Sequence, residues 1–467
     1  MLRRTREWIE DRTGIGAAIK PIVEHPIPRN TGWAYVFGSG TLISFVVLVA
    51  TGIVLATGYT PTTNDAFQSL QWLSHGAVLG RELRAIHYFA ASAMIVCMGA
   101  HVVRVFLYAS YKYPREVNWL IGVLLLLLTL GSAFTGQLLR WDQNGIWSLG
   151  VLSEQVGRTP LIGDWLAQFL LGGRTVGGQT LSRFFAFHVF FLPALIIGAV
   201  SFHLFLVIRN GISEPPKAGR PVDPKTYKAW YRDLLKREGV PFWPDGMWRD
   251  VVFGTAVVAV IMALAVFFGP PALTTAPPDP SIINAAPQPD WYFLWYFAAL
   301  AVVPKDAATW IMLGGPVLLI VLMVALPFVA NRGERSPLRR PWSIAIILGI
   351  AIIMASLFIE SASQPWVPRF DAKPLPASLI GATSGPVYRG AQLFHSEDCA
   401  YCHLIGNYGG IRGPNLTAIA DRYTTDQMTI RILNGGTNMP AYASILTPGQ
   451  VQDLVAFLES RHEPPPR

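Results

Sequence analysis

The stretches RAIHYFAASAMIVCMGAH (residues 84–101) and FFAFHVFFLPALIIGAVSFH (residues 184–203) decide the fold. Each places two histidines in an apolar run: His87 and His101 are 14 residues apart, and His188 and His203 are 15 apart. In an α-helix these spacings put the two imidazoles about 21–22 Å apart along the axis and within roughly 60° of one face. Ionisable residues inside a membrane are costly and are usually functional. Each helix therefore presents one imidazole near each membrane surface.

The composition is that of a membrane protein. The chain of 467 residues is 52% hydrophobic and 14% charged, with a mean hydropathy of +0.38. An ordinary soluble enzyme carries about 25% charged residues. These values exclude a disordered chain and a nucleic-acid tail protein, so no nucleic-acid partner is expected. Seven stretches are long enough to span a bilayer. They are 33–57, 86–108, 117–139, 184–208, 251–269, 309–330 and 342–359.

Basic residues in the loops predict the orientation. The N-terminal segment and alternate loops hold 21 Lys and Arg residues, and the other loops hold 7. The positive-inside rule places the N-terminus and the 210–249 loop in the cytoplasm, and seven spans then place the C-terminus outside. No cleavable signal peptide is visible. Segment 3–20 fits either a helix on the membrane surface or a charged tail.

The histidine spacing predicts haem ligation. The two histidine-bearing spans run in the same direction, so His87 can face His188 near the outer surface and His101 can face His203 near the inner surface. Two facing imidazoles suit a low-spin haem iron. A lone histidine in lipid is more often a polar contact or part of a proton path, but two pairs with near-equal spacing favour two non-covalent b-type haems.

Other residues share this spacing. Glycine permits close approach, and four glycines follow a 14-residue period that would give a porphyrin room at two depths. They are Gly38 and Gly52 in the first span and Gly122 and Gly136 in the third. Arg84 and Arg183 lie just outside the outer histidines, where they fit either haem propionates or the interfacial cations of an ordinary span.

The C-terminal part carries a separate signature. Cys399-Ala-Tyr-Cys402-His403 is the motif for covalent c-type haem, and Met439 in Asn-Met-Pro is the natural second axial ligand. A zinc or redox site is disfavoured by the histidine that follows. Pro-rich residues 361–386 read as an extended spacer, and residues 387–467 as a small helical cytochrome c domain.

These motifs resemble cytochrome b of the cytochrome bc-type quinol-oxidising complexes, particularly the chloroplast-type branch. Residues 1–210 resemble the four-span di-haem domain, 211–360 the separate three-span subunit, and the last part a class I cytochrome c. The resemblance is carried by Ala50-Thr-Gly52, Arg84-Ala-Ile-His87, His101, Pro114-Arg-Glu, Thr135-Gly136, Trp141-Asp-Gln-Asn-Gly-Ile-Trp147, Thr180-Leu-Ser-Arg183-Phe, His188, His203, Pro289-Asp-Trp-Tyr292 and Arg339-Arg-Pro341.

The resemblance implies two quinone sites. The outer, quinol-oxidising site would be formed by Pro289, Asp290, Trp291 and Tyr292 with the loop around 147–151, and Asp290 would accept a quinol proton. On its own, this motif reads as an interfacial turn with aromatic anchors. Arg209 is a candidate at the inner, quinone-reducing site.

The sequence departs from the family pattern in three places. Val36 stands where the chloroplast-type branch carries a cysteine for an extra covalent haem, which argues against that haem here. Asp290 stands where many members have glutamate, so the carboxylate reaches one methylene less far. The fusion of all three parts in one chain raises the local concentration of the c-type haem.

The predicted protein is an all-α subunit of a bacterial inner-membrane quinol:cytochrome c oxidoreductase that contributes to a proton gradient. It would need a Rieske-type iron–sulfur partner, would pass electrons to a downstream cytochrome c or terminal oxidase, and would form a homodimer as family members do. The alternatives are a haem-bearing membrane anchor for another oxidoreductase, without bifurcation, and a transporter with a histidine proton relay.

Overall fold

The computed structural model describes residues 2–173, 176–273, 288–303, 307, 309–363, 372–410, 413–435 and 439–463. In this part of the chain seven helices are long and apolar enough to cross a membrane. Their segments are α3 (Phe37–Gly58), α5 (Gly80–Leu107), α6 (Glu116–Leu138), α9 (Gly178–Ala186) continued by η2 (Phe187–Phe191) and α10 (Leu192–Asn210), η3 (Phe242–Gly246) with α12 (Met247–Phe268), η4 (Trp310–Gly314) with α15 (Gly315–Val329), and α16 (Pro341–Ser363). The seven predicted spans are confirmed.

The histidine-bearing helices lie in a four-helix core. α3 packs on α5, α6 packs on α10, and α12 covers α3 and α5. The fourth span is one continuous helix with a π-helical turn at Phe187–Phe191, which contains His188. Such turns often occur at functional sites because they re-aim one side chain without ending the helix.

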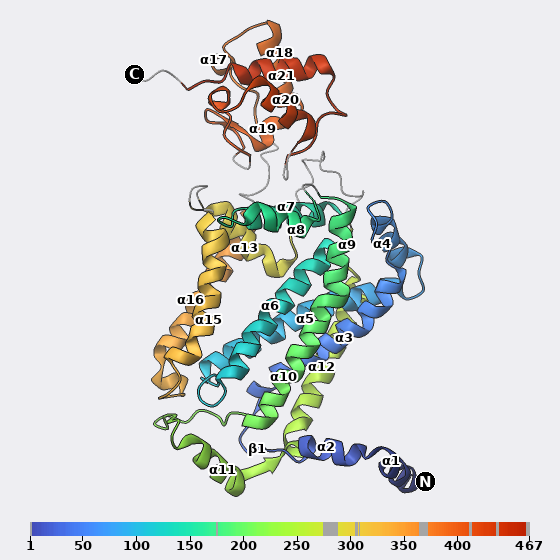
Figure 1. The fold of residues 1–467 in the computed structure, drawn as a ribbon, viewed down its shortest axis with the longest axis vertical. Helices are drawn as coiled ribbons and strands as arrows, with labels where there is room; N and C mark the ends of the chain where they lie inside the picture. Colours follow the sequence, from blue (N-terminus) through green and yellow to red (C-terminus); the bar gives the residue numbers. More distant parts are fainter. Residues whose placement is uncertain are drawn as a thin grey trace.

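Short elements close the two ends of the bundle (Figure 1). One end carries α4 (Ala66–His75), α7 (Gln143–Gly157), α8 (Gly163–Leu171) and α13 (Trp291–Val302), and the other carries α1 (Leu2–Thr13), α2 (Ile15–Val23), η1 (Trp33–Tyr35), α11 (Tyr227–Glu238) and η5 (Pro337–Arg339). At the second end β1 (Pro26–Pro28) pairs antiparallel with β2 (Gly239–Pro241). The C-terminal domain lies at the α7 end, away from the N-terminus (Figure 1).

One local expectation needs correction, and one short helix was not expected. The predicted loop around residues 147–151 is wrong, because this segment belongs to α7, which Asp142 caps by accepting from the amide of Gly145 at 3.0 Å. The short apolar helix α13 follows Asp290 directly. Its 12 residues span about 18 Å, too little to cross the bilayer.

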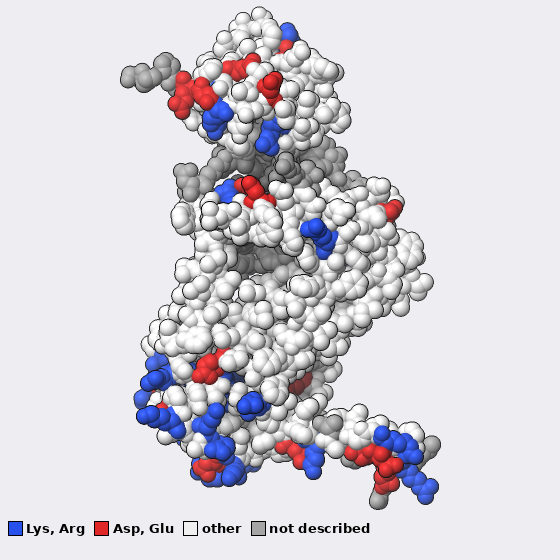
Figure 2. Space-filling view, in the orientation of Figure 1, with Lys and Arg blue, Asp and Glu red and all other residues white. Residues whose placement is uncertain are grey.

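Charge divides the molecule along its long axis. Lys and Arg gather at the end that carries α11 and the N-terminus, and the visible middle band is almost free of charged side chains (Figure 2). The chain is tied together at the basic end by a buried network. Arg115 donates to the carbonyl of Gly211 and the hydroxyl of Tyr227, both at 2.9 Å, and Tyr227 donates to Glu214, which is also paired with Arg335.

The C-terminal domain is a separate small helical unit. It contains α17 (Ala377–Ile380), α18 (Gly385–Ser396), α19 (Cys399–Cys402), β3 (Leu404–Ile405), β4 (Tyr408–Gly409), η6 (Ile419–Asp421), α20 (Thr425–Asn434) and α21 (Pro448–Glu459). Its core includes Leu375 and Ile380, with α18 crossing α21. The spacer predicted over 361–386 is therefore wrong at its ends: α16 continues to Ser363, and apolar residues from 375 onward pack into the domain. Residues 364–371 lie outside the described residues.

The crossing of α18 and α21 generates a prediction. A Cβ at Gly390 would lie within 3 Å of the Asp453 carbonyl carbon and the Phe457 Cβ, so Gly390→Ala must push the helices apart. Overpacking costs about 1–3 kcal/mol. We expect lower hydrogen-exchange protection in peptides from α18 and α21. Gly449→Ala in α21 is the control, because its Cβ meets no atom within 4 Å. Equal protection in the two variants would contradict this account of the crossing.

Candidate functional site: paired histidines and an acidic outer pocket

The outer histidines face each other across the bundle. The ring centroids of His87 and His188 are 6.2 Å apart. A metal bound about 2 Å from one nitrogen of each ring would separate the centroids by about 6 Å. Nδ1 of His188 donates to the Ser132 carbonyl at 2.9 Å, and Nδ1 of His87 lies 2.9 Å from the Thr51 hydroxyl. These contacts leave Nε2 of each ring for a metal, which is the usual arrangement of a ligating histidine.

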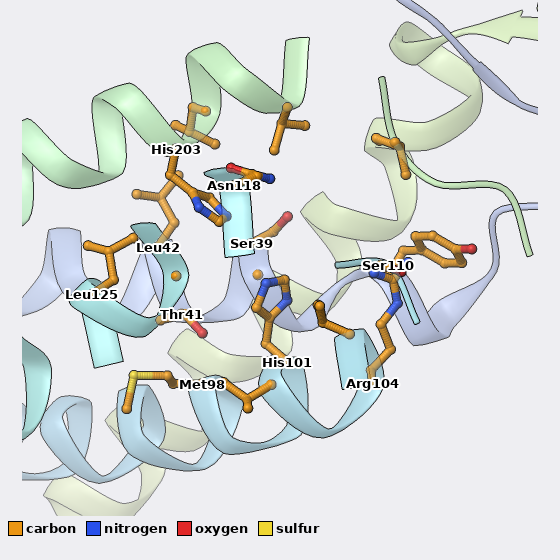
Figure 3. Close-up of a pocket in the computed structure, with 18 of the residues that line it drawn as sticks. Ser39, Thr41, Leu42, Met98, His101, Arg104, Ser110, Asn118, Leu125 and His203 are labelled. Atoms are coloured by element: carbon orange, nitrogen blue, oxygen red, sulfur yellow. The ribbon is translucent and has the colours of Figure 1, made fainter. Parts of the chain in front are cut away.

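The inner histidines repeat this spacing. His101 and His203 have ring centroids 6.5 Å apart, and Figure 3 shows their rings facing each other across the cavity. The structure therefore brings together the pairs that the sequence predicted, each at a distance that fits one metal ion.

Each pair opens into a cavity. The cavity at His87 and His188 has a volume of about 270 Å³, and the cavity at His101 and His203 about 350 Å³. Their linings are mostly apolar, as expected for a cofactor site with a few placed polar groups. Four residues line both cavities and form the wall between them. They are Phe45, Met94, Thr129 and Ile196.

The four glycines pack against the histidines. A Cβ at Gly52 would lie 3.2 Å from Cε1 of His87, and a Cβ at Gly136 would lie 2.6 Å from Cε1 of His188. The expectation was clearance for a porphyrin, but the structure places the imidazole itself over each glycine.

The inner glycines follow the same rule less tightly. A Cβ at Gly38 would lie 3.2 Å from Cε1 of His101, and one at Gly122 would lie 3.7 Å from Cε1 of His203. The 14-residue period thus reports where each histidine ring rests on the neighbouring helix.

The two predicted outer arginines lie in different places. Arg84 lines the outer cavity and donates to the Ser74 hydroxyl and the Pro271 carbonyl, each at 2.6 Å. Arg183 donates to the Phe169 carbonyl and stacks on the Phe169 ring. Contacts of either arginine with propionates stay predictions.

Arg104 is a residue that the sequence analysis missed. It lies one turn after His101 and lines the inner cavity, with its guanidinium 3.6 Å from the centroid of the Tyr35 ring (Figure 3). Its Nε and Nη2 atoms, the Tyr35 hydroxyl and Asn118 Oδ1 are buried without a hydrogen-bond partner among the described residues. Because buried polar groups are normally paired, the Arg104 N–H groups and the Tyr35 hydroxyl suit an acceptor such as a carboxylate, whereas Asn118 Oδ1 needs a donor. The sequence signal that could have identified Arg104 is its charge inside an otherwise apolar span.

The inner cavity also differs from expectation in its cations. Arg209 is exposed at the end of α10, whereas Arg249, Asp250 and Ser39 line the cavity. A quinone contact of Arg209 stays a prediction, and the cavity offers Arg249 and Asp250 as further polar candidates.

The outer cavity contains the predicted acidic motif. Asp290 and Tyr292 line it, and the Tyr292 hydroxyl donates to Asp290 Oδ2 at 2.9 Å. The Asp290 amide donates to Gln137 Oε1 at 3.0 Å. Pro289 is buried next to them, and the Trp291 indole donates to Ser92 at 3.1 Å. The motif is therefore fixed to α5 and α6, more firmly than an interfacial turn would be.

Arg140 also lies at this site. Its Nη1 is 3.6 Å from Asp290 Oδ1, and its Nη2 is 2.8 Å from Asp142. Burial raises the pKa of Asp290, and this outweighs the opposing effects of Arg140 and the Tyr292 hydroxyl. A carboxylate with a raised pKa beside a low-dielectric cavity can accept a proton transiently.

The C-terminal motif has the support expected of a c-type haem ligand. Cys399 and Cys402 lie at the two ends of α19, and Nδ1 of His403 donates to the Pro414 carbonyl at 2.9 Å. A Cβ at Gly413 would lie 2.6 Å from the His403 ring. A hydrogen bond from Nδ1 to a backbone carbonyl is the usual support of a ligating histidine. Met439 packs against the domain core.

Family models match successive parts of the chain. Residues 92–277 match "Cytochrome b(N-terminal)/b6/petB", residues 277–370 match "Cytochrome b(C-terminal)/b6/petD", and residues 385–458 match "Cytochrome C oxidase, cbb3-type, subunit III". A cytochrome b of Rickettsia prowazekii is 31% identical over 77% of this chain and 88% of its own length. This chain belongs to the cytochrome b family.

Further relatives and one solved structure are similar to this chain. Cytochrome b6 of Heliobacterium mobile is 40% identical over 44% of this chain and 99% of its own length. The "Menaquinol:cytochrome c reductase cytochrome b subunit" of Geobacillus thermodenitrificans is 36% identical over 46% of this chain and 100% of its own length. The solved structure "Hyperthermophilic respiratory Complex III" shares the fold, with a TM-score of 0.61, 24% identity, and coverage of 85% of this chain and 97% of that one.

The glycine contacts generate a prediction with an internal control. In Gly136→Ala the added methyl would lie 2.6 Å from the His188 ring, whereas in Gly122→Ala it would lie 3.7 Å from the His203 ring, an ordinary contact. We expect Gly136→Ala to lower the b-type absorbance of purified protein and Gly122→Ala to preserve it. Reduced-minus-oxidised spectra would measure this, and equal b-type content in the two variants would contradict the proposed packing.

Proposed function

We propose that this cytochrome b/c fusion is the catalytic subunit of a quinol:cytochrome c oxidoreductase. The observation that carries the proposal is that Asp290 and the histidine pair His87 and His188 line one cavity. A proton acceptor and a site for an electron carrier therefore lie within reach of one substrate. A haem anchor without quinol oxidation, or a proton-relaying transporter, leaves the fixed acidic motif without a role.

Each proposed haem has its own residues. His87 and His188 would hold an outer b-type haem and His101 and His203 an inner one, with Arg104 pairing an inner propionate. Cys399 and Cys402 would attach a c-type haem covalently, with His403 and Met439 as axial ligands. When bound, these groups supply one-electron carriers at two depths of the membrane and outside it.

The residues of the outer pocket would handle the substrate proton. Asp290 would accept it on a carboxylate oxygen, and the donated bonds from Gln137 and Tyr292 keep the motif in place. The apolar lining excludes water, so the transfer occurs between oriented groups. At the inner cavity Arg249 and Asp250 are placed to bind a quinone and to supply a proton.

The remaining parts of the proposal concern topology and partners. The excess of Lys and Arg in the N-terminal segment and alternate loops favours a cytoplasmic N-terminus. The C-terminal domain lies at the end of the bundle that carries α7 and α13 (Figure 1), and α13 directly follows Asp290. We infer a multi-pass protein of the bacterial inner membrane with its cytochrome c domain outside. Two of the three cysteines belong to the c-type motif and Cys97 lies within α5. A Rieske-type partner would therefore bring the iron–sulfur centre, and the complex would be dimeric.

Haem stoichiometry tests the assignment directly. We expect two extractable b-type haems and one covalent c-type haem for each chain, from pyridine haemochrome spectra before and after acid–acetone extraction. His188→Ala should remove one b-type haem and Cys402→Ala should disrupt the c-type attachment alone. A chain with three covalent haems, or with none in the bilayer, is incompatible with the proposal.

The acidic motif gives a second test. Asp290→Asn removes the proton acceptor, so we expect quinol:cytochrome c reductase activity to fall by about 10²-fold, the usual contribution of general base catalysis. Asp290→Glu restores a carboxylate and should retain most of the activity. In the wild type the rate should fall with decreasing pH through the raised pKa of Asp290, because the protonated acid cannot accept a second proton. Unchanged activity of Asp290→Asn, with full haem content, would show that another group accepts the proton.

A further inference from the structure

Arg140 lies between two carboxylates at the edge of the outer cavity. Its Nη2 and Nε atoms are 2.8 and 3.2 Å from Asp142 Oδ2, and its Nη1 atom is 3.6 Å from Asp290 Oδ1. We propose that Arg140 is a positioning residue for quinol oxidation, which orients the carboxylate of Asp290 and keeps it ionised to receive the substrate proton. This inference rests on the proposed function.

Asp142 anchors the guanidinium. Its side chain is fully buried, and its Oδ1 atom accepts from the amide of Gly145 at the start of α7. A carboxylate at a helix N-terminus is stabilised by the helix dipole and by this hydrogen bond. Asp142 therefore holds Arg140 in place whether or not Asp290 carries a proton.

One cation between two carboxylates leaves an excess negative charge in a poorly hydrated place. The side chains of Arg140 and Asp290 are only 13% and 12% exposed, and Asp142 is not exposed at all. The repulsion between two carboxylates in such a site falls when one of them takes a proton. Asp142 lies closer to Arg140 than Asp290 does, at 2.8 Å against 3.6 Å, and it also accepts the capping hydrogen bond from Gly145. The proton therefore goes to Asp290.

The other titratable groups around Asp290 do not replace Arg140. Tyr292 donates to the second oxygen of Asp290, and Tyr88 on α5 also faces the carboxylate. Arg84 on α5 interacts with Arg140 and Asp142, but its guanidinium is bound to Ser74 and Pro271. Arg140 is the cation paired with Asp290 in the described part of the chain.

Each transfer moves one proton and one electron out of the quinol. The O–H bond of the quinol breaks, an O–H bond forms on Asp290, and the electron leaves the quinol for the one-electron iron–sulfur acceptor of the proposed function. Neutral Asp290 is then no longer attracted to Arg140, which stays paired with Asp142. Loss of the proton to the outer aqueous side restores the Asp290–Arg140 pair.

Two changes that each remove one charge should shift the pH profile in opposite directions. Arg140→Gln removes the nearby cation, so the pKa of Asp290 rises and the acidic limb of kcat/KM moves to higher pH by about one unit. Asp142→Asn removes the competing anion and preserves a helix cap, so the pKa of Asp290 falls and the limb moves to lower pH. A purely structural role would not produce shifts of opposite sign.

The controls separate position from charge. Arg158→Gln is the matched control. Arg158 is the residue that follows the last turn of α7, and its side chain contacts Glu154, at 2.8 Å, and Thr309. Its acidic limb should stay at the wild-type pH. Arg140→Lys retains the charge and should move the limb back toward the wild-type position.

Several outcomes would overturn the inference. The inference fails if the acidic limb of the kcat/KM profile does not move in fully haem-loaded Arg140→Gln. It also fails if Asp142→Asn moves this limb to higher pH. If Arg140→Gln does not assemble, Asp142→Asn alone decides by the direction of its shift. The proposed function fails in a different way, because the wild type would then show no quinol oxidation that depends on Asp290.

Discussion

The bundle depends on the contact between each histidine ring and a glycine on a neighbouring helix. The closest is between Gly136 and His188, where a methyl group would lie 2.6 Å from the ring. With the ring resting on the glycine and its Nδ1 atom bonded to the Ser132 carbonyl, the other nitrogen points across the bundle. The 6.2 Å separation of the ring centroids of His87 and His188 fits this restraint, because the His188 imidazole has little room to retreat. The inner rings, 6.5 Å apart, rest on Gly38 and, less tightly, on Gly122.

Apolar side chains lie between the two histidine pairs. Phe45, Met94 and Ile196 pack together as one cluster and, with Thr129, line both cavities. Packed apolar side chains offer water few hydrogen-bond partners, so they disfavour a water path between the outer and inner cavities. A protein that releases protons on one side of a membrane and takes them up on the other needs such a separation, because a water path would let protons leak back across the membrane.

The facing of the two histidine pairs could be predicted from sequence because the spacing of the histidines encodes depth and face along a helix. The seven spans and the four histidines followed from hydropathy and the 14- and 15-residue intervals. Arg104 and Arg140 were not found in this way. Arg104 is a candidate because two of its nitrogen atoms lie unpaired beside a cavity. Arg140 is a candidate because it contacts two carboxylates that come from separate segments of the chain. Arg209 was chosen for its position near His203, but its side chain is exposed at the end of α10. Contacts of this kind are tertiary, and residue spacing does not report them.

The end of α6 connects the electron-carrier site with the proton site. Gly136 supports the ring of His188, the next residue, Gln137, accepts from the amide of Asp290, and Arg140 meets the carboxylate of Asp290. The Gln137 amide also donates to Ser148 on α7, which joins this turn to the helix at the outer surface. Because these contacts arise within five consecutive residues, a displacement of the turn would move the histidine and the carboxylate together. The position of His188 relative to Asp290 is therefore set by one short segment, as the proposed transfer of an electron and a proton from one substrate requires.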